Sequence, residues 1–87
     1  MKPQNLQAAI EHAVASTTPG KARSKALAAV RWVLKCAEGY AALDGINCII
    51  VTDISNAVVF DGRDNEKLKA TFWSVNLGTP CTPVLLP

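Results

Sequence analysis

The chain changes character near Gly45. Before that point apolar residues recur at helical spacing, and after it two segments, INCIIVTD and NAVVF, are rich in β-branched residues. Helical spacing buries one face of a helix, whereas β-branched side chains favour extended backbone. A chain of 87 residues has material for one core, so both kinds of element must share it. The sequence therefore predicts a single domain, residues 1–87, of the α+β class, with two N-terminal helices packed on a small antiparallel sheet.

Two helices are expected before Gly45. The first should cover about residues 4–16, where apolar side chains recur at i, i+3, i+4, i+7 and i+8: Leu6, Ala9, Ile10, Ala13 and Val14. The segment STTPG ends it, and Thr18 followed by Pro19 suits the start of another helix. The alanine-rich sequence that follows predicts a second helix over about residues 19–42.

The second half of the chain predicts a hairpin, a short third element and a tail. The hairpin should span about residues 46–61, with 46–52 paired to 57–61 across the turn residues between them. Residues 64–76 fit a short helix through Leu68, Phe72 and Val75, but TFWSVNL fits a strand equally well, and both alternatives stay open. The tail, residues 77–87, has three prolines in its last eight residues, so it should lie extended over the surface or along a sheet edge.

The stretch KARSKALAAVRWVLK, residues 21–35, carries five positive charges and no negative one, so the net charge of +2 is the sum of +5 here and −3 elsewhere. On a helix, with about 100° between successive residues, its charged side holds a tryptophan. This side is the candidate partner-binding face: Lys21, Lys25, Arg31, Trp32 and Lys35. In one interpretation Trp32 is an exposed anchor ringed by cations. In the other it packs in the core and the cations solvate the rim.

No pattern typical of catalysis is found. His12 is the one histidine, and its neighbour Glu11 would not face it on a helix, so no acid–base pair is indicated. The acidic string DGRDNE, with Asp61, Asp64 and Glu66, lacks the ligand spacing of a calcium loop and is better explained as a turn and a helix cap. Glycine-rich phosphate loops and nucleophile elbows are absent. The sequence predicts no enzyme and no cofactor.

The three cysteines, Cys36, Cys48 and Cys81, are widely spaced and odd in number. This argues against a disulfide framework and favours free thiols in a reducing compartment. No CxxC pair and no second histidine accompany them, so no metal site is predicted. The first residues lack a continuous apolar run, and no run is long enough to cross a bilayer, so we expect a cytoplasmic protein.

These observations favour binding over catalysis. The first hypothesis is a protein-binding module or inhibitor that docks the basic Trp32 face onto the acidic or nucleic-acid-reading surface of a larger protein. Small chains of this kind include inhibitors that phages and other mobile elements direct at host defence. The alternative is a small homodimeric regulator that binds nucleic acid through the same basic face. Homo-oligomerisation through the hairpin edge and the tail is a third possibility.

Overall fold

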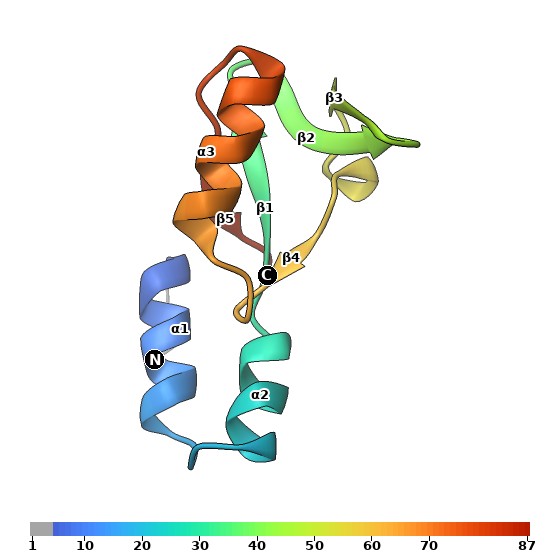
Figure 1. Ribbon diagram of the computed structural model, residues 1–87. Coiled ribbons are helices and arrows are strands. Elements are labelled where there is room, and N and C mark those ends of the chain that lie inside the picture. Colours follow the sequence, from blue (N-terminus) through green and yellow to red (C-terminus); the bar gives the residue numbers. More distant parts are fainter. Residues whose placement is uncertain (1–4) are drawn as a thin grey trace.

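The computed structural model describes residues 5–87, which form three α-helices, a short 3₁₀-helix and one five-stranded antiparallel sheet (Figure 1). The α+β class predicted from the sequence is confirmed. In chain order the elements are α1 (Leu6–Ala15), α2 (Lys21–Ala28), β1 (Arg31–Cys36), β2 (Gly39–Asp44), β3 (Asn47–Val51), η1 (Ile54–Asn56), β4 (Phe60–Asp61), α3 (Glu66–Leu77) and β5 (Thr82–Leu85). The molecule is elongated, 38 × 25 × 20 Å, with α1 and α2 at one end and the β2–β3 hairpin at the other.

β1 is the central strand of the sheet. One of its edges pairs with β5, from Trp32 opposite Leu85 to Lys35 opposite Thr82. On its other edge β4 pairs with the N-terminal half and β2 with the C-terminal half, and β3 adds to the outside of β2. The proline-rich tail thus contributes a short edge strand, so its predicted extended course along a sheet edge is confirmed for residues 82–85.

The core forms around Trp32, whose side chain is completely buried, with 0% of its surface exposed. Its ring stacks on Phe60 with 4.7 Å between the ring centroids, and its indole Nε1 donates a hydrogen bond of 2.8 Å to the carbonyl of Asp61. Trp73 of α3 meets Phe60 edge-on, with centroids 6.4 Å apart, and Leu6 of α1 belongs to the same cluster. One aromatic cluster therefore joins β1, β4, α3 and α1.

The second helix is shorter than its predicted span of residues 19–42. α2 ends at Ala28, and residues 31–36, expected to be helical, are strand β1. Along β1 the side chains of Arg31 and Lys35 are exposed, whereas those of Trp32, Leu34 and Cys36 on the other face are buried. Val33 lies between the two cations on their face and is also completely buried. Strand alternation sends the cations outward and the tryptophan inward, which lets a central strand bury its large apolar side chains.

The predicted hairpin over residues 46–61 is also wrong. β3 pairs with the preceding strand β2, with Asp44 opposite Asn47 across the two-residue turn Gly45-Ile46. Gly45 has a φ of 62°, the left-handed region that favours glycine, as such tight turns require. Of the expected second strand, only β4 is formed, and it pairs with β1. β2 had no strand signal of its own because it is rich in small residues, among them the buried Ala41 and Ala42.

The ambiguous segment 64–76 is a helix. Asn65 caps α3 by accepting a hydrogen bond of 3.1 Å from the amide of Leu68, and the helix ends at Gly78, which has a φ of 67°. In the DGRDNE string Asp64, a candidate for this cap by sequence, instead accepts from the amide of Asp61 and closes the preceding turn. The spacing of Leu68, Phe72 and Val75 that favoured a helix does not mark its buried face, because these three side chains are exposed and Trp73 is buried.

α1 confirms the first predicted helix from Leu6 onward, and the predicted start at residue 4 lies outside the described residues. α1 packs on α2 through a tight link. Arg23 of α2 fixes this link by donating from Nη2 to the carbonyls of Val14 and Thr17, 2.9 Å each. In residues 5–87, no helix is both long enough and apolar enough to cross a membrane.

We predict that Trp32→Ala lowers the free energy of unfolding by about 3–5 kcal/mol, because it empties the centre of the core. Trp32→Phe should cost less, since it keeps an aromatic ring beside Phe60 and loses only the hydrogen bond to Asp61 and part of the ring volume. Urea unfolding followed by circular dichroism measures both. A loss below about 1 kcal/mol for Trp32→Ala would contradict the central position of this side chain.

Candidate functional site

The five residues predicted to bind a partner do not share one face. Four of them are exposed cations on two different elements, α2 and β1, and the fifth is buried beneath the strand. Of the two interpretations of Trp32, the exposed anchor is wrong, and packing in the core is confirmed. The exposed members are Lys21, Lys25, Arg31 and Lys35.

The exposed apolar side chains of α3 form a different surface. Leu68, Phe72 and Val75 are 68%, 57% and 76% exposed, and they recur at i, i+4 and i+7. At about 100° per residue they form one stripe, and Trp73 with Leu77 lies about 140–180° away, on the side that packs against the sheet. A helix that is apolar on two opposite sides is typical of one that is covered on both. Residues 5–87 cover only the Trp73 side. We call the Leu68–Phe72–Val75 stripe the α3 face.

A hollow of ≈ 480 Å³ lies beside the α3 face, between α3 and the end of β2. The buried rings of Phe60 and Trp73 line it, together with the exposed side chains of Leu43, Leu68 and Phe72. The aromatic core of the protein therefore reaches the surface here, as the base of an apolar depression. A depression of this kind accepts an apolar side chain from a partner.

The charges beside the α3 face are positive. Lys67 and Lys69 flank the stripe, about 100° to either side of Leu68, whereas Glu66 falls on the inward side by the same spacing. The ammonium of Lys69 lies 5.8 Å from the centroid of the Phe60 ring, at the hollow, which is a cation–π distance.

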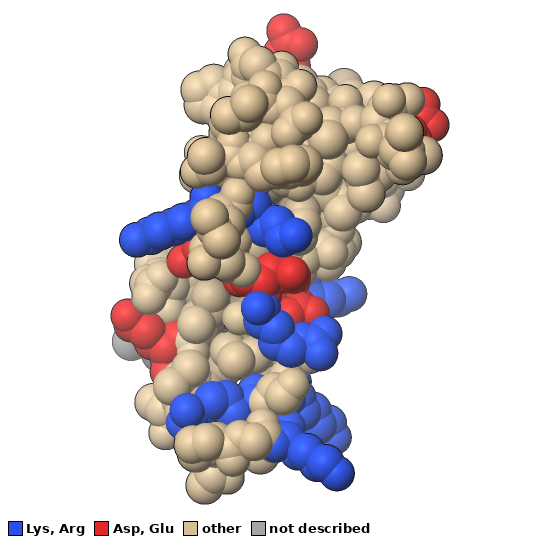
Figure 2. All heavy atoms as spheres, viewed as in Figure 1, with Lys and Arg blue, Asp and Glu red and all other residues tan. Residues whose placement is uncertain are grey.

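Neither lysine is neutralised by a carboxylate within ion-pair distance. The one ion pair among residues 5–87 is Arg63 with Asp61, at 2.7 Å, and the hydrogen bond from Arg63 holds the pKa of Asp61 below its usual value. Figure 2 shows few charged atoms over the upper part of the molecule, where α3 and the β2–β3 hairpin lie, and most lysine and arginine atoms over the middle and lower parts. The α3 face is therefore apolar with a positive rim.

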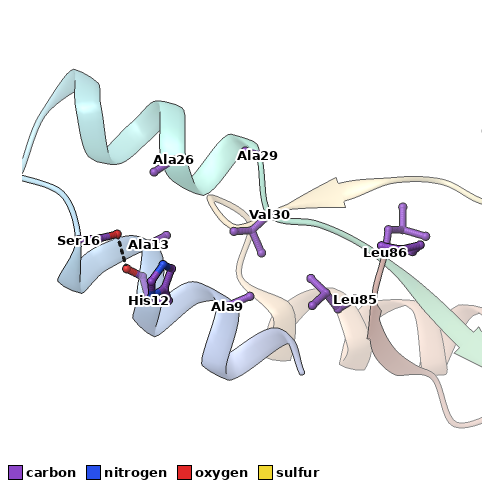
Figure 3. A pocket seen from close by; sticks show the side chains of 10 residues that line it. Ala9, His12, Ala13, Ser16, Ala26, Ala29, Val30, Leu85 and Leu86 are labelled. Carbon is purple, nitrogen blue, oxygen red and sulfur yellow. Dashed lines mark hydrogen bonds between the residues drawn. The ribbon is translucent and has the colours of Figure 1, made fainter. Parts of the chain in front are cut away.

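A second hollow, of ≈ 630 Å³, lies between α1, α2 and the end of the tail (Figure 3). Small and aliphatic side chains form most of its wall, including Ala9, Ala26 and Leu85. Its polar side chains are His12, which is exposed at the rim, and Ser16, whose hydroxyl donates to the backbone carbonyl of His12 at 2.6 Å. Small-molecule sites are mostly apolar with a few placed polar groups, and of the two polar side chains here the Ser16 hydroxyl is already used within its own helix.

No metal centre is formed by the part of the chain that the structure describes, because no three His, Cys, Asp or Glu side chains there converge on a common point.

The candidate functional residues that the sequence did not reveal are those of the α3 face. Phe72 and Trp73 are adjacent, and on a helix adjacent side chains point about 100° apart. That adjacency was a signal that one of the two large aromatics would face away from the core.

Comparisons with known protein families, with curated proteins and with solved structures find no match to this chain.

We predict that truncating the two adjacent aromatics of α3 lowers the free energy of unfolding by very different amounts. Phe72→Ala should lower the free energy of unfolding by less than about 1 kcal/mol, because this side chain is mostly exposed. Trp73→Ala should lower it by about 3–5 kcal/mol, because this ring is buried against Phe60. Thermal and urea unfolding of both variants measure the difference. Equal losses would show that Phe72 is part of the core.

Proposed function

We propose that the protein is a non-enzymatic, cytoplasmic protein-binding domain whose α3 face docks an amphipathic helix of a larger protein partner. The observation that carries the proposal is the exposed stripe of Leu68, Phe72 and Val75 beside an apolar hollow. The partner helix would place its apolar seam along this stripe and its acidic side chains against Lys67 and Lys69.

The apolar part of the argument rests on the cost of exposure. Full burial of a leucine, phenylalanine or valine side chain stabilises by about 1.5–3 kcal/mol, and all three of these side chains are more than half exposed in the isolated chain. Contiguous apolar surface on a small domain is typical of protein interfaces. A helix is a suitable occupant because the side chains of α3 at i and i+4 form a ridge that fits into a groove on the surface of a second helix.

The charged part of the argument selects the partner. Lys67 and Lys69 lie on opposite flanks of the stripe, and neither has an ion-pair partner among the described residues. Acidic side chains beside the apolar seam of a partner helix would complement this rim and favour correct docking. A second copy of the chain offers the same two cations and no acid on this face, so self-association lacks that complementarity. We therefore favour a heterologous partner.

The four exposed cations of the original hypothesis, on α2 and β1, support a competing function, the homodimeric nucleic-acid-binding regulator. They lack an exposed aromatic beside them, because Trp32 is buried. Nucleic-acid binding through them would rest on phosphate contacts alone and would weaken steeply with salt. A partner from a host defence system also stays a prediction, since only the small size of the chain and its lack of catalytic motifs suggest it.

The docking proposal is tested with a designed helical peptide that carries leucines at i, i+3/i+4 and i+7 and glutamates on both flanks. We expect fluorescence anisotropy to show that the peptide binds, and the largest changes in amide NMR shift to fall on residues of α3. Phe72→Ser should weaken binding at least about tenfold, which corresponds to about 1.4 kcal/mol. The same peptide with lysines in place of the glutamates should bind more weakly than the acidic one.

Val14→Ser is the control, because Val14 is also a partly exposed apolar residue but lies on α1, away from the α3 face. Its binding should equal that of the unmodified protein. The proposal would be overturned if the acidic and basic peptides bound equally well, or if Phe72→Ser bound the acidic peptide as tightly as the unmodified protein does. A dimer in sedimentation that Phe72→Ser dissociates would show that a second copy covers the face. Salt-sensitive binding of an oligonucleotide, lost on replacing Lys21 and Lys25, would favour the regulator.

A further inference from the structure

Two of the three cysteines meet in the core although they are 45 positions apart in sequence. The Sγ atoms of Cys36 and Cys81 are 3.3 Å apart, and the two side chains are 3% and 8% exposed. Cys36 ends β1, and Cys81 directly precedes β5. Within residues 5–87 this is the one sulfur–sulfur contact, and Cys48 on β3 does not take part in it.

We propose that Cys36 and Cys81 are a modification site, a thiol pair that a low-molecular-weight disulfide oxidises to a disulfide bond between β1 and β5. The sequence indicated three separate free thiols, so this pairing is a property of the fold. It is independent of the α3 face and of the function proposed for it.

The strand register supports the bond. Lys35 lies opposite Thr82 in the β1–β5 ladder, so the next opposed pair is Cys36 and Cys81. Directly opposed residues of an antiparallel pair have Cα atoms about 4.5–5.5 Å apart. A disulfide accepts Cα separations of about 4.4–6.8 Å, which a regular continuation of the ladder to this pair satisfies. The sulfurs need to approach by only about 1 Å to reach bonding distance.

The position of Cys81 is fixed from a second direction. Its amide donates a hydrogen bond of 2.9 Å to Oγ of Ser74, and the hydroxyl of Ser74 donates to the carbonyl of Ala70 at 2.6 Å. Cys81 is therefore tied to α3 as well as aligned beside Cys36. Such positioning keeps the two thiols together in the folded protein.

The reaction is a thiol–disulfide exchange in two steps. One cysteine thiolate attacks a sulfur of the small disulfide, which forms a mixed disulfide and expels one small thiolate. The second cysteine, after losing its proton to solvent, attacks the protein sulfur of the mixed disulfide and expels the other small thiolate. The two protein thiols lose two protons and two electrons, and the small disulfide is reduced to two thiols once the expelled thiolates are protonated.

Access to the pair is through the surface where β1 and β5 end. A hollow of ≈ 470 Å³ there is lined by Cys36, Pro80 and Thr82, among others. β5 is a strand of four residues that pairs with β1 alone, so it should open locally more readily than the strands inside the sheet. Burial raises the pKa of Cys36 to about 12, so its thiol is protonated at neutral pH and the exchange should speed up as pH rises.

The test is incubation of the full chain with oxidised glutathione at mildly alkaline pH, followed by alkylation and intact mass measurement. We expect a species lighter by two hydrogens that retains one alkylatable thiol in place of three. Trypsin alone leaves Cys36 and Cys48 in one peptide, but additional cleavage after Glu38 separates them. The expected product links the Cys36–Glu38 peptide to the peptide that contains Cys81.

Stability provides the second measurement. Closing so long a loop should raise the thermal midpoint by on the order of 10 °C, and a reductant should reverse the rise. Cys48→Ser should behave like the unmodified protein, whereas Cys81→Ala and Cys36→Ala should show neither the mass change nor the rise. Stable glutathione adducts on Cys36 or Cys81, a protein disulfide through Cys48, a disulfide between two chains or no reaction of Cys36 and Cys81 would each overturn the proposal. The peptide map of the unmodified chain decides this even if an alanine variant does not fold.

Discussion

Trp32 connects parts of the chain that are far apart in sequence. Its ring stacks on Phe60, its indole N–H binds the carbonyl of Asp61, and Phe60 in turn meets Trp73 of α3. These contacts place α3 against the sheet at a fixed position. The rings of Phe60 and Trp73 are also the base of the hollow beside the α3 face. The apolar surface proposed to bind a partner thus takes its shape from the same aromatic cluster that holds the fold together.

The sequence predicted the class of fold and the first helix, but it did not predict the end of the second helix. Arg31 and Lys35 are four residues apart, a spacing that puts two side chains on one face of a helix and also on one face of a strand. The charge pattern was therefore compatible with both. What decides for a strand is pairing with β2, β4 and β5, whose residues are distant in sequence. Local patterns carry no information about such partners.

In the candidate site, too, some features could be predicted from local sequence and others depend on contacts between distant residues. The adjacent pair Phe72 and Trp73 allowed the inference that one aromatic would face outward, but only the fold shows that Trp73 is the buried one. The sequence left open whether Trp32 is exposed or in the core, and its contacts with Phe60 and Asp61, about thirty positions away, decide for the core. The contact of Cys36 with Cys81 follows from the β1–β5 register, and nothing in their spacing indicated it.

The pairing of β1 with β5 has a consequence for how the protein is made. β1 is complete once residue 36 has been synthesised, but the strand that covers one of its edges begins at Thr82. On the ribosome, β1 therefore emerges with an unpaired edge and remains so until nearly fifty further residues have followed. Unpaired strand edges in nascent chains are prone to aggregation. Arg31 and Lys35, exposed along this strand, place two positive charges on it during that interval, which discourages pairing with other chains.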